Sequence, residues 1–361
     1  MIGDHTDYHQ GFVLPVAIAY DVKMFARIIE EPTIRLHSVV FGETKEFPST
    51  VSPADVRQGS WESYFLAVLN EFRNRGAQLP GLEVIIDGDV PHGGGLSSSA
   101  AYEVAVAALL NTIAESGLSP IELALLAQSA ENGPFVGMQC GIMDQYISAC
   151  ARESCALMID CRSLESQAIP FDETAAGILI ANSMVRRGLV ESEYNSRRAE
   201  CHKTLEIIRR DGQFHPDALR DLDVSTLPEL QKKLDPPSFR RIRHVITENQ
   251  RVLDFAEALR RNDWQSAGRS MIESHESLRD DYEVSCAELD SLVRIACQTD
   301  GVFGARMTGA GFGGCVVCLF DPSRRENVEN TIRQEYEKTT GRVADIYITR
   351  PVSGAWTREL S

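Results

Sequence analysis

The 361-residue sequence contains no hydrophobic run near the roughly 18 residues that a membrane-spanning helix requires. It also has no excess of positive charge, since 36 lysines and arginines stand against 52 aspartates and glutamates, for a formal net charge of -16. A chain this acidic repels nucleic acids and anionic lipid surfaces. We therefore expect neither a nucleic-acid partner nor a membrane, and a phosphate ligand would need a local anion-binding site.

The cysteine content does not indicate a disulfide-bonded protein. Nine cysteines, an odd number, are spread along a long chain, which is not the pattern of a disulfide framework. Reduced thiols and a cytoplasmic location are expected. Cys315 and Cys318 form a single CxxC with no second pair and no histidine cluster, inside an apolar run that predicts a strand. We interpret them as core thiols rather than metal or redox residues.

Three common nucleotide-binding signatures are missing. The chain has no GxxxxGK[ST] loop, no glycines at the spacing of a dinucleotide-binding fingerprint, and neither of the protein-kinase motifs HRD and DFG. It has instead the segment PHGGGLSSSAA at residues 91–101, between a predicted strand at 82–90 and a predicted helix at 100–115. The triplet of glycines followed by three serines is the sharpest local signal in the chain.

This glycine–serine segment predicts a phosphate site. Glycines let the backbone turn tightly and approach a ligand without a Cβ in the way. The following helix presents unpaired N–H groups and the positive end of its dipole, which together attract a di- or triphosphate. A glycine turn with a serine N-cap is the alternative. The residues assigned to nucleotide binding are Gly93, Gly94, Gly95, Leu96, Ser97, Ser98 and Ser99.

Hydrophobic periodicity predicts a mixed α+β fold. Strands are expected at residues 11–29, 39–47, 82–90, 177–182, 302–308, 315–320 and 343–349. Helices are expected at residues 61–73, 100–115, 120–131, from 143 onward, 193–210, most of 227–298 with an interruption at Pro236 and Pro237, and 325–339. A polar stretch without a clear period at residues 163–174 indicates a boundary between domains 1–170 and 171–361.

Four separated blocks resemble the galactokinase branch of the GHMP kinases, the family that also contains homoserine, mevalonate and phosphomevalonate kinases. They are IGDHTDY at residues 2–8 continued by GFVLP at 11–15, the glycine–serine segment, CGIMDQ at 140–145 and RMTGAGFGGC at 306–315. The resemblance implies a ribosomal-protein-like N-terminal domain, a ferredoxin-like C-terminal domain and substrates bound in the cleft between them. It also implies transfer of the γ-phosphoryl group of ATP, with Mg²⁺, to the anomeric hydroxyl of galactose by a monomeric enzyme.

The resemblance assigns roles to individual residues. Asp144 matches the catalytic base that accepts the sugar proton, although the residues alone would also allow a helix cap. The positions that match sugar contacts are Asp4, His5, Asp7, Gly141 and Tyr194. Without the resemblance, the first three could form a solvated turn or a metal site, and Tyr194 could be a surface aromatic.

Further positions match the nucleotide side of the family's site. Ser99 and Glu131 match Mg²⁺ ligands and are hard oxygen donors, although Glu131 could also be an ordinary carboxylate at a helix end. Trp61 and Tyr64 resemble the apolar wall beside adenine, with core packing as the alternative. Residues 309–314 match a second glycine loop close to the phosphate loop.

Two departures from the family pattern affect the expected activity. The resemblance implies an arginine a few residues before the position of Met1, which stabilises charge on the reacting oxygens, and we expect the natural start to lie upstream. Asp4 stands where many galactokinases have Glu, which withdraws the carboxylate by about 1.5 Å and is expected to loosen its contact with the sugar 6-hydroxyl. The alternatives are a catalytically impaired sensor of sugar and ATP, or a kinase for a related sugar such as arabinose.

Overall fold

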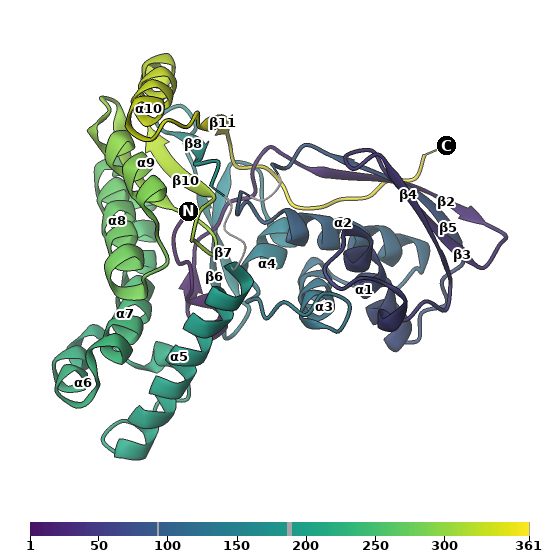
Figure 1. Cartoon of the computed structure of the whole chain (residues 1–361), viewed down its shortest axis with the longest axis horizontal. Helices are drawn as coiled ribbons and strands as arrows, with labels where there is room; N and C mark the ends of the chain where they lie inside the picture. The colour runs from purple at the N-terminus through teal and green to yellow at the C-terminus, as the bar shows by residue number, and fades with distance from the viewer. Residues whose placement is uncertain (92–93, 186–189, 361) are drawn as a thin grey trace. The chain divides into compact units, whose positions relative to one another are not determined.

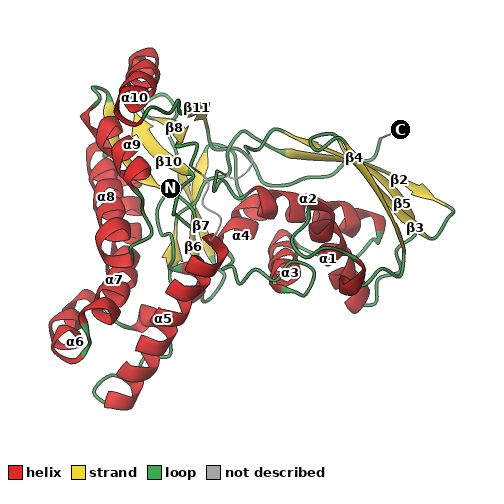
Figure 2. Ribbon diagram, viewed as in Figure 1, coloured by secondary structure: helices red, strands yellow, loops and turns green. Residues whose placement is uncertain are grey.

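The computed structural model describes residues 1–91, 94–185 and 190–360 (Figure 1). His92 and Gly93, the latter assigned to nucleotide binding, lie outside the described residues. The chain forms two compact units, each with helices and sheets (Figure 2), so the predicted α+β class is confirmed. The first unit contains Met1–Val16, His92–Leu96 and Arg152–Val352, and the second contains Ala17–Pro91, Ser97–Ala151 and Ser353–Ser361.

The second unit is a four-stranded sheet with helices on one face (Figure 2). Its strands, in sheet order, are β2 (Val22–Ile29), β5 (Gly81–Gly88), β3 (Thr33–Ser38) and β4 (Glu43–Pro48), with only the β3–β5 pair parallel. Its helices are α1 (Trp61–Asn74), α2 (Ser98–Ile113), α3 (Pro120–Asn132) and α4 (Met143–Cys150). Alternate residues of β3 and β5 are buried against α1, α2 and α3, which is the period-2 pattern of a sheet with one covered face.

The boundaries of α1 and α3 follow from their sequences. The apolar positions from Trp61 to Phe72 recur at helical spacing and bury one face of α1 in the core of the second unit. At the start of α3, Ser119 and Glu122 form a capping box, with the Ser119 N–H donating to Glu122 Oε2 at 2.8 Å, and Pro120 occupies the first helical position. Both predicted helices are therefore confirmed within a residue or two.

The first unit contains two antiparallel sheets. The smaller consists of β1 (Phe12–Val13), β6 (Cys155–Asp160) and β7 (Ser166–Pro170). The larger has the order β11 (Asp345–Thr349), β8 (Gly177–Asn182), β10 (Cys315–Phe320) and β9 (Val302–Met307). In chain order these four strands lie as 4-1-3-2, with helices after the first and third strands, which is the ferredoxin-like topology.

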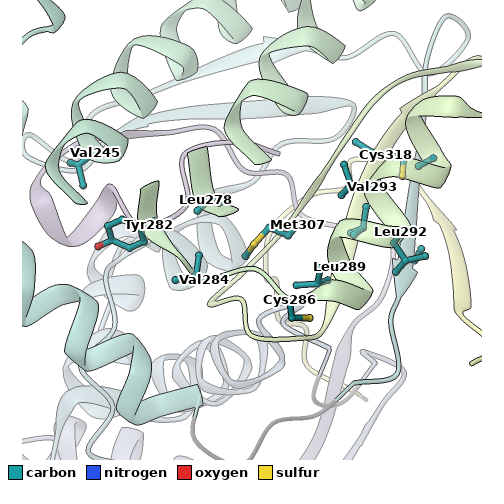
Figure 3. Close-up of a cluster of buried hydrophobic side chains, with 14 of the residues drawn as sticks. Val245, Leu278, Tyr282, Val284, Cys286, Leu289, Leu292, Val293, Met307 and Cys318 are labelled. Carbon is teal, nitrogen blue, oxygen red and sulfur yellow. The ribbon is translucent and has the colours of Figure 1, made fainter. Parts of the chain in front are cut away.

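The helices of the first unit are α5 (Val190–Asp211), α6 (Leu227–Lys233), α7 (Pro236–Arg260), α8 (Trp264–Ser277), α9 (Ala287–Gln298) and α10 (Arg325–Thr340). Their apolar faces and the larger sheet enclose one hydrophobic core, part of which Figure 3 shows around Tyr282, Met307 and Cys318. Cys315 and Cys318 are buried and unbridged, which confirms their interpretation as core thiols. Among the described residues, no helix is both long and apolar enough to cross a membrane.

The structure differs from the sequence-based expectation at three places. The predicted strand at 11–29 is divided into β1 and β2, which belong to different units. The interruption predicted at Pro236 and Pro237 is present, but it lies just before them, between the end of α6 at Lys233 and the start of α7 at Pro236, because the first turn of a helix needs no N–H donor to an earlier carbonyl. The aperiodic stretch around Pro170 contains β7, which pairs with β6.

The compact units also differ from the predicted ranges 1–170 and 171–361. Residues 1–16 and 152–170 lie in the same unit as the C-terminal half, because the β1–β6–β7 sheet packs against α7. Proximity along the chain therefore does not determine to which unit these strands belong.

Candidate active site

The glycine–serine segment connects β5 to α2, as predicted. Ser97 is the N-cap residue of α2 but has a left-handed backbone, with φ of 58°, and its side chain makes no capping hydrogen bond. The alternative interpretation, a serine N-cap, is therefore right in position, but the serine makes no capping hydrogen bond. Because no acidic residue lies in the first turn either, the helix terminus keeps the positive character that binds an anion.

Two glycine loops of the first unit lie backbone against backbone. A Cβ added at Gly309 would lie 2.8 Å from the carbonyl oxygen of Gly95, and one at Gly314 would lie 2.8 Å from that of Gly94. Both positions have a positive φ, +79° at Gly309 and +84° at Gly314, so side chains are disfavoured there on two grounds. The predicted proximity of the second glycine loop to the phosphate loop is confirmed by these contacts.

Asp4, predicted to contact the sugar, is held by residues far away in the sequence. Arg306 Nη1 donates to Asp4 Oδ2 at 2.5 Å, and the N–H of Gly309 donates to Asp4 Oδ1 at 2.6 Å. Burial alone would raise the pKa of Asp4, but the Arg306 guanidinium outweighs it and holds the pKa below its usual range. Asp4 therefore connects the N-terminal segment to the second glycine loop.

His5 lies in a cluster of aromatic rings. Its Nδ1 is 2.7 Å from the hydroxyl of Tyr8, and its ring centroid lies 4.7 Å from that of Tyr282 and 5.4 Å from that of Tyr194. Burial lowers the pKa of His5 to about 4, so the ring is neutral at pH 7. His5 Nε2 is buried without a hydrogen-bond partner among the described residues. The structure thus brings the predicted sugar contacts His5 and Tyr194 together.

Helix α7 anchors this N-terminal segment from the other side. Glu248 Oε1 accepts from the N–H of Gly3 at 3.0 Å, and Asn249 Oδ1 accepts from the N–H of Phe12 at 2.8 Å. Asp7, the remaining predicted sugar contact on this segment, begins a short 3-10 turn over Asp7–His9 and is half-buried. Residues of α7 thus fix the backbone on both sides of Asp7.

The predicted base and metal ligands lie in the second unit. Asp144 is in the first turn of α4, where the helix dipole favours a negative charge, and the buried Gly141 lies two residues before the start of that helix. Ser99 lies in the first turn of α2, and Glu131 near the end of α3. Helix α4 contacts both α2 and α3, so these helices form one cluster.

Glu131 belongs to a buried polar group that the sequence did not reveal. Its Oε2 accepts from Gln145 Nε2 at 2.5 Å and from Cys140 Sγ at 3.1 Å. Gln145 Nε2 also donates to Glu103 Oε2 at 3.2 Å. Burial and the neighbouring Glu131 carboxylate raise the pKa of Glu103 well above its usual value.

The donor set fits a magnesium ion that is also coordinated by a nucleotide. Within the described ranges no three His, Cys, Asp or Glu side chains are grouped as a protein-only metal site. A serine hydroxyl and a carboxylate are hard oxygen donors, and Mg²⁺ usually takes few protein ligands and completes its shell with phosphate oxygens and water. Ser99 and Glu131 suit that role chemically.

The predicted adenine wall is partly engaged in other contacts. Trp61 Nε1 donates to Glu43 at 3.2 Å, and its ring stacks on Phe41 with centroids 6.1 Å apart. Tyr64, one turn further along α1, is half-buried. The exposed Phe41 gives this corner of the second unit a further aromatic surface.

Three residues of these networks had no predicted role. Glu103 lies four residues after Ser99 on the same face of α2, and a lone carboxylate inside an otherwise apolar helical run is the signal that could have revealed it. Gln145 and Arg306 stand inside the quoted blocks CGIMDQ and RMTGAGFGGC, but their bonding depends on tertiary contacts.

Comparison with protein families defines the class. The model "GHMP kinases N terminal domain" matches residues 63–152, and "GHMP kinases C terminal" matches residues 255–338. The glycine–serine segment and α2 lie in the first range, and β9 and the second glycine loop lie in the second. The fold is therefore that of a GHMP kinase.

More specific matches identify the branch. The "Galactokinase galactose-binding signature" matches residues 1–28. A galactokinase of Roseiflexus sp. (strain RS-1) is 42% identical over 98% of this chain and 89% of its own length. The crystal structure of Lactococcus lactis galactokinase complexed with galactose is similar with a TM-score of 0.92, at 32% identity over 98% of this chain and 91% of that one. The chain belongs to the galactokinase family.

More distant structures share only the fold. The Methanococcus jannaschii mevalonate kinase is 17% identical, with a TM-score of 0.67 over 98% of this chain and 95% of that one. At this identity the similarity supports the GHMP kinase fold and says nothing about the sugar.

Proposed function

We propose that this protein transfers the γ-phosphoryl group of ATP to the anomeric hydroxyl of galactose, giving galactose 1-phosphate. The observation that carries the proposal is the galactose-binding signature at residues 1–28, which contains Asp4, His5 and Asp7, in a chain that is 42% identical to a galactokinase over nearly its whole length. The glycine–serine segment at the start of α2 supports a nucleotide donor.

The proposed roles follow the chemistry of each group. Asp144 accepts the proton of the anomeric hydroxyl as general base. The sugar is contacted by His5, Asp7, Gly141 and Tyr194. Asp4 either contacts the 6-hydroxyl of the sugar itself or positions Arg306 and Gly309, to which it is hydrogen-bonded. A neutral His5 can donate one hydrogen bond and accept another, which suits a hydroxyl ligand.

The phosphate side is supplied by the loop and the helix termini. Residues Gly93–Ser99 would hold the phosphates, and Ser99 and Glu131 would hold Mg²⁺, which neutralises the charge of the transferred group when bound. Positioning and fixed dipoles then supply most of the rate, and no covalent intermediate with the protein is required. We further propose a monomeric, cytoplasmic enzyme.

An assay of ADP release with a panel of sugars tests this proposal. Purified protein, ATP and Mg²⁺ are incubated with galactose, fucose or arabinose, and ADP is measured by a coupled enzyme. We expect galactose-dependent release that exceeds release with either analogue. Galactose binding without ADP release would instead indicate a sensor, and equal turnover of arabinose would indicate a broader sugar kinase.

A related sugar is a second candidate because of the bonding of Asp4. Its carboxylate already accepts from Arg306 and from the backbone of Gly309, and only 4% of the residue is exposed. A carboxylate so engaged discriminates the 6-hydroxyl less than a free one would. A small ratio of galactose to fucose turnover would support this second candidate.

A further inference from the structure

Gln145 is the centre of a buried polar group in the second unit. Its amide nitrogen donates to Glu131 Oε2 at 2.5 Å and to Glu103 Oε2 at 3.2 Å, and both contacts are buried. Neither carboxylate belongs to the helix of Gln145: Glu103 is on α2 and Glu131 is on α3, whereas Gln145 is on α4. One side chain thus connects three helices.

The chemistry of the group fixes the orientation of the amide. The amide nitrogen carries both N–H donors of Gln145 and the amide oxygen carries none, so the nitrogen is the atom that faces Glu131 and Glu103. A reversed amide would place its oxygen, which can only accept, against Glu131 Oε2, where the structure has a short N–H bond. Gln145 Oε1 and Glu103 Oε1 are buried without a hydrogen-bond partner in the part of the chain that the structure describes. A protein rarely keeps such unsatisfied atoms unless the arrangement has a use.

Each of the three connected helices carries one of the proposed functional residues. Ser99 precedes Glu103 by four residues, so the two share a face of α2. Glu131 is itself a proposed metal ligand, and its Oε2 also accepts from Cys140 Sγ, so two donors fix its orientation. Asp144 immediately precedes Gln145 at the start of α4. Gln145 is therefore bonded to Glu131, linked to Ser99 through Glu103 on α2, and next to Asp144 in the chain.

We propose that Gln145 is a positioning residue which, by donating to Glu103 and Glu131 together, holds the carboxylate of Glu131 and the first turn of α4 in the arrangement that binds the nucleotide with its metal ion. Glu103 is the anchor of Gln145 and does not touch the substrates. The expected effect on turnover rests on the proposed function. The expected effect on the affinity for ATP with Mg²⁺ can be measured without turnover.

The role of Gln145 predicts a selective defect. Without the amide donor, Glu131 Oε2 loses the N–H that holds it at 2.5 Å, and Glu103 Oε2 loses its bond to α4. The affinity for ATP with Mg²⁺ should fall, because it depends on the orientation of Glu131. The affinities for ATP without metal and for galactose should be unchanged, because they depend on the glycine loops and on the N-terminal segment.

The test compares Gln145→Leu, Glu103→Ala and Glu103→Gln with wild type, and uses Glu62→Gln as a matched control. Glu62 is a buried carboxylate of α1 in the same unit, outside this polar group. Nucleotide affinity is measured by calorimetry with Mg²⁺ and, separately, with a chelator. The Mg²⁺ concentration for half-maximal velocity and the thermal unfolding midpoint are measured in parallel.

We expect Gln145→Leu to weaken ATP binding about tenfold with Mg²⁺, to raise the half-maximal Mg²⁺ concentration by a similar factor, and to leave metal-free ATP binding within about twofold. Glu103→Ala should show a smaller defect of the same kind. Glu103→Gln keeps an oxygen that accepts from the amide and should restore binding to within about threefold of wild type.

Two outcomes would overturn the inference: metal-dependent binding in Gln145→Leu equal to that of the Glu62→Gln control, or an equal loss with and without Mg²⁺. If Gln145→Leu does not fold, ATP binding with and without Mg²⁺ is compared between Glu103→Ala and Glu103→Gln instead. Equal metal-dependent binding in these two variants would then overturn the inference. Failure of the proposed function would give a different result. Wild type would then not phosphorylate galactose, but the binding of ATP by wild type and the variants, with and without Mg²⁺, could still be compared.

Discussion

The two compact units hold their candidate residues in different ways. In the first unit, Asp4 and Gly3 are fixed by Arg306 and Glu248, contacts that join opposite ends of the chain. In the second unit, Ser99, Glu131 and Asp144 lie on consecutive helices between residues 98 and 150, and Gln145 connects those helices. The sugar side therefore depends on long-range pairing, and the phosphate side on local helix termini.

The chemistry of the two regions differs accordingly. The first unit buries neutral histidines and an arginine–aspartate pair around its N-terminal segment, which suits recognition of hydroxyl groups. The second presents a helix N-terminus, serine hydroxyls and carboxylates, which suit phosphate and a hard cation. The following predictions test this division, beginning with the largest expected effect.

Replacing the proposed base, Asp144, should affect catalysis far more than it affects nucleotide binding. Asp144→Asn should lower kcat by about 10²- to 10⁴-fold, since general-base catalysis contributes that much, while the affinity for ATP stays near wild type. Steady-state kinetics and calorimetry measure the two quantities. Asp87→Asn, which alters an exposed carboxylate on β5, is the control. Near-normal turnover in Asp144→Asn would rule out the base assignment.

The buried pair of the first unit should control the stability of that unit alone. Asp4→Ala leaves the fully buried Arg306 without its carboxylate, which typically costs about 3–5 kcal/mol. Hydrogen exchange should increase in peptides of β9 and the second glycine loop.

Peptides of α1 and α2 should keep wild-type exchange in Asp4→Ala. Replacing both partners, as Asp4→Leu with Arg306→Met, should recover part of the loss because no charge stays buried alone. Equally faster hydrogen exchange in both units would contradict the conclusion that the Asp4–Arg306 pair stabilises the first unit alone.

The contact between the glycine loops can be separated from backbone strain. Gly314→Ala places a Cβ 2.8 Å from the carbonyl oxygen of Gly94 at a φ of +84°, whereas Gly341→Ala has a similar φ of +71° and nothing within 4 Å. Both should destabilise by about 1 kcal/mol through strain. Only Gly314→Ala should also raise the KM for ATP several-fold, and an unchanged KM would show that the second loop does not support the first.

A further expected effect is a pH dependence of stability that comes from buried histidines of the first unit. Burial lowers the pKa of His9 and of His244 to about 3, and that of His5 to about 4, from an ordinary 6.5. The unfolded chain then binds these protons more readily than the folded one, so the free energy of unfolding falls as the pH drops from about 6.5 towards 4.

Urea unfolding at pH 7 and pH 5 measures this pH dependence. His9→Phe should reduce it because the variant lacks one buried titrating ring. His215→Gln, an exchange at an exposed position after the end of α5, should leave it as in wild type. A pH dependence unaltered in His9→Phe would show that the buried ring does not contribute.

Much of the second unit could be predicted from the sequence, because its signals are local. The helix at residues 61–73 and the capping box at Ser119 depend on neighbouring residues, and so do strand β5 and helix α2 on the two sides of the glycine–serine segment. The polar group of Glu103 and Gln145 could not be predicted, since it depends on how α2 and α4 pack together.

In the first unit the hydrophobic pattern of the sequence predicted less of the structure. The strand Cys315–Phe320 is buried on both faces and could be recognised as a continuous apolar run. Strand β7 has only one buried residue, so its period is not visible, and the engagement of Asp4 by Arg306 joins positions that no short-range rule connects.

The position of the transferred phosphate tests the proposed activity most directly. The product of ATP and ¹³C-labelled galactose should be examined by ¹³C and ³¹P NMR, with wild type and Asp144→Asn in parallel. The proposal predicts phosphorus coupling at C1 with wild type and, after the same incubation time, at least about 100-fold less of this product with the variant. Phosphate at C6, or no sugar phosphate while both ligands bind, would contradict it.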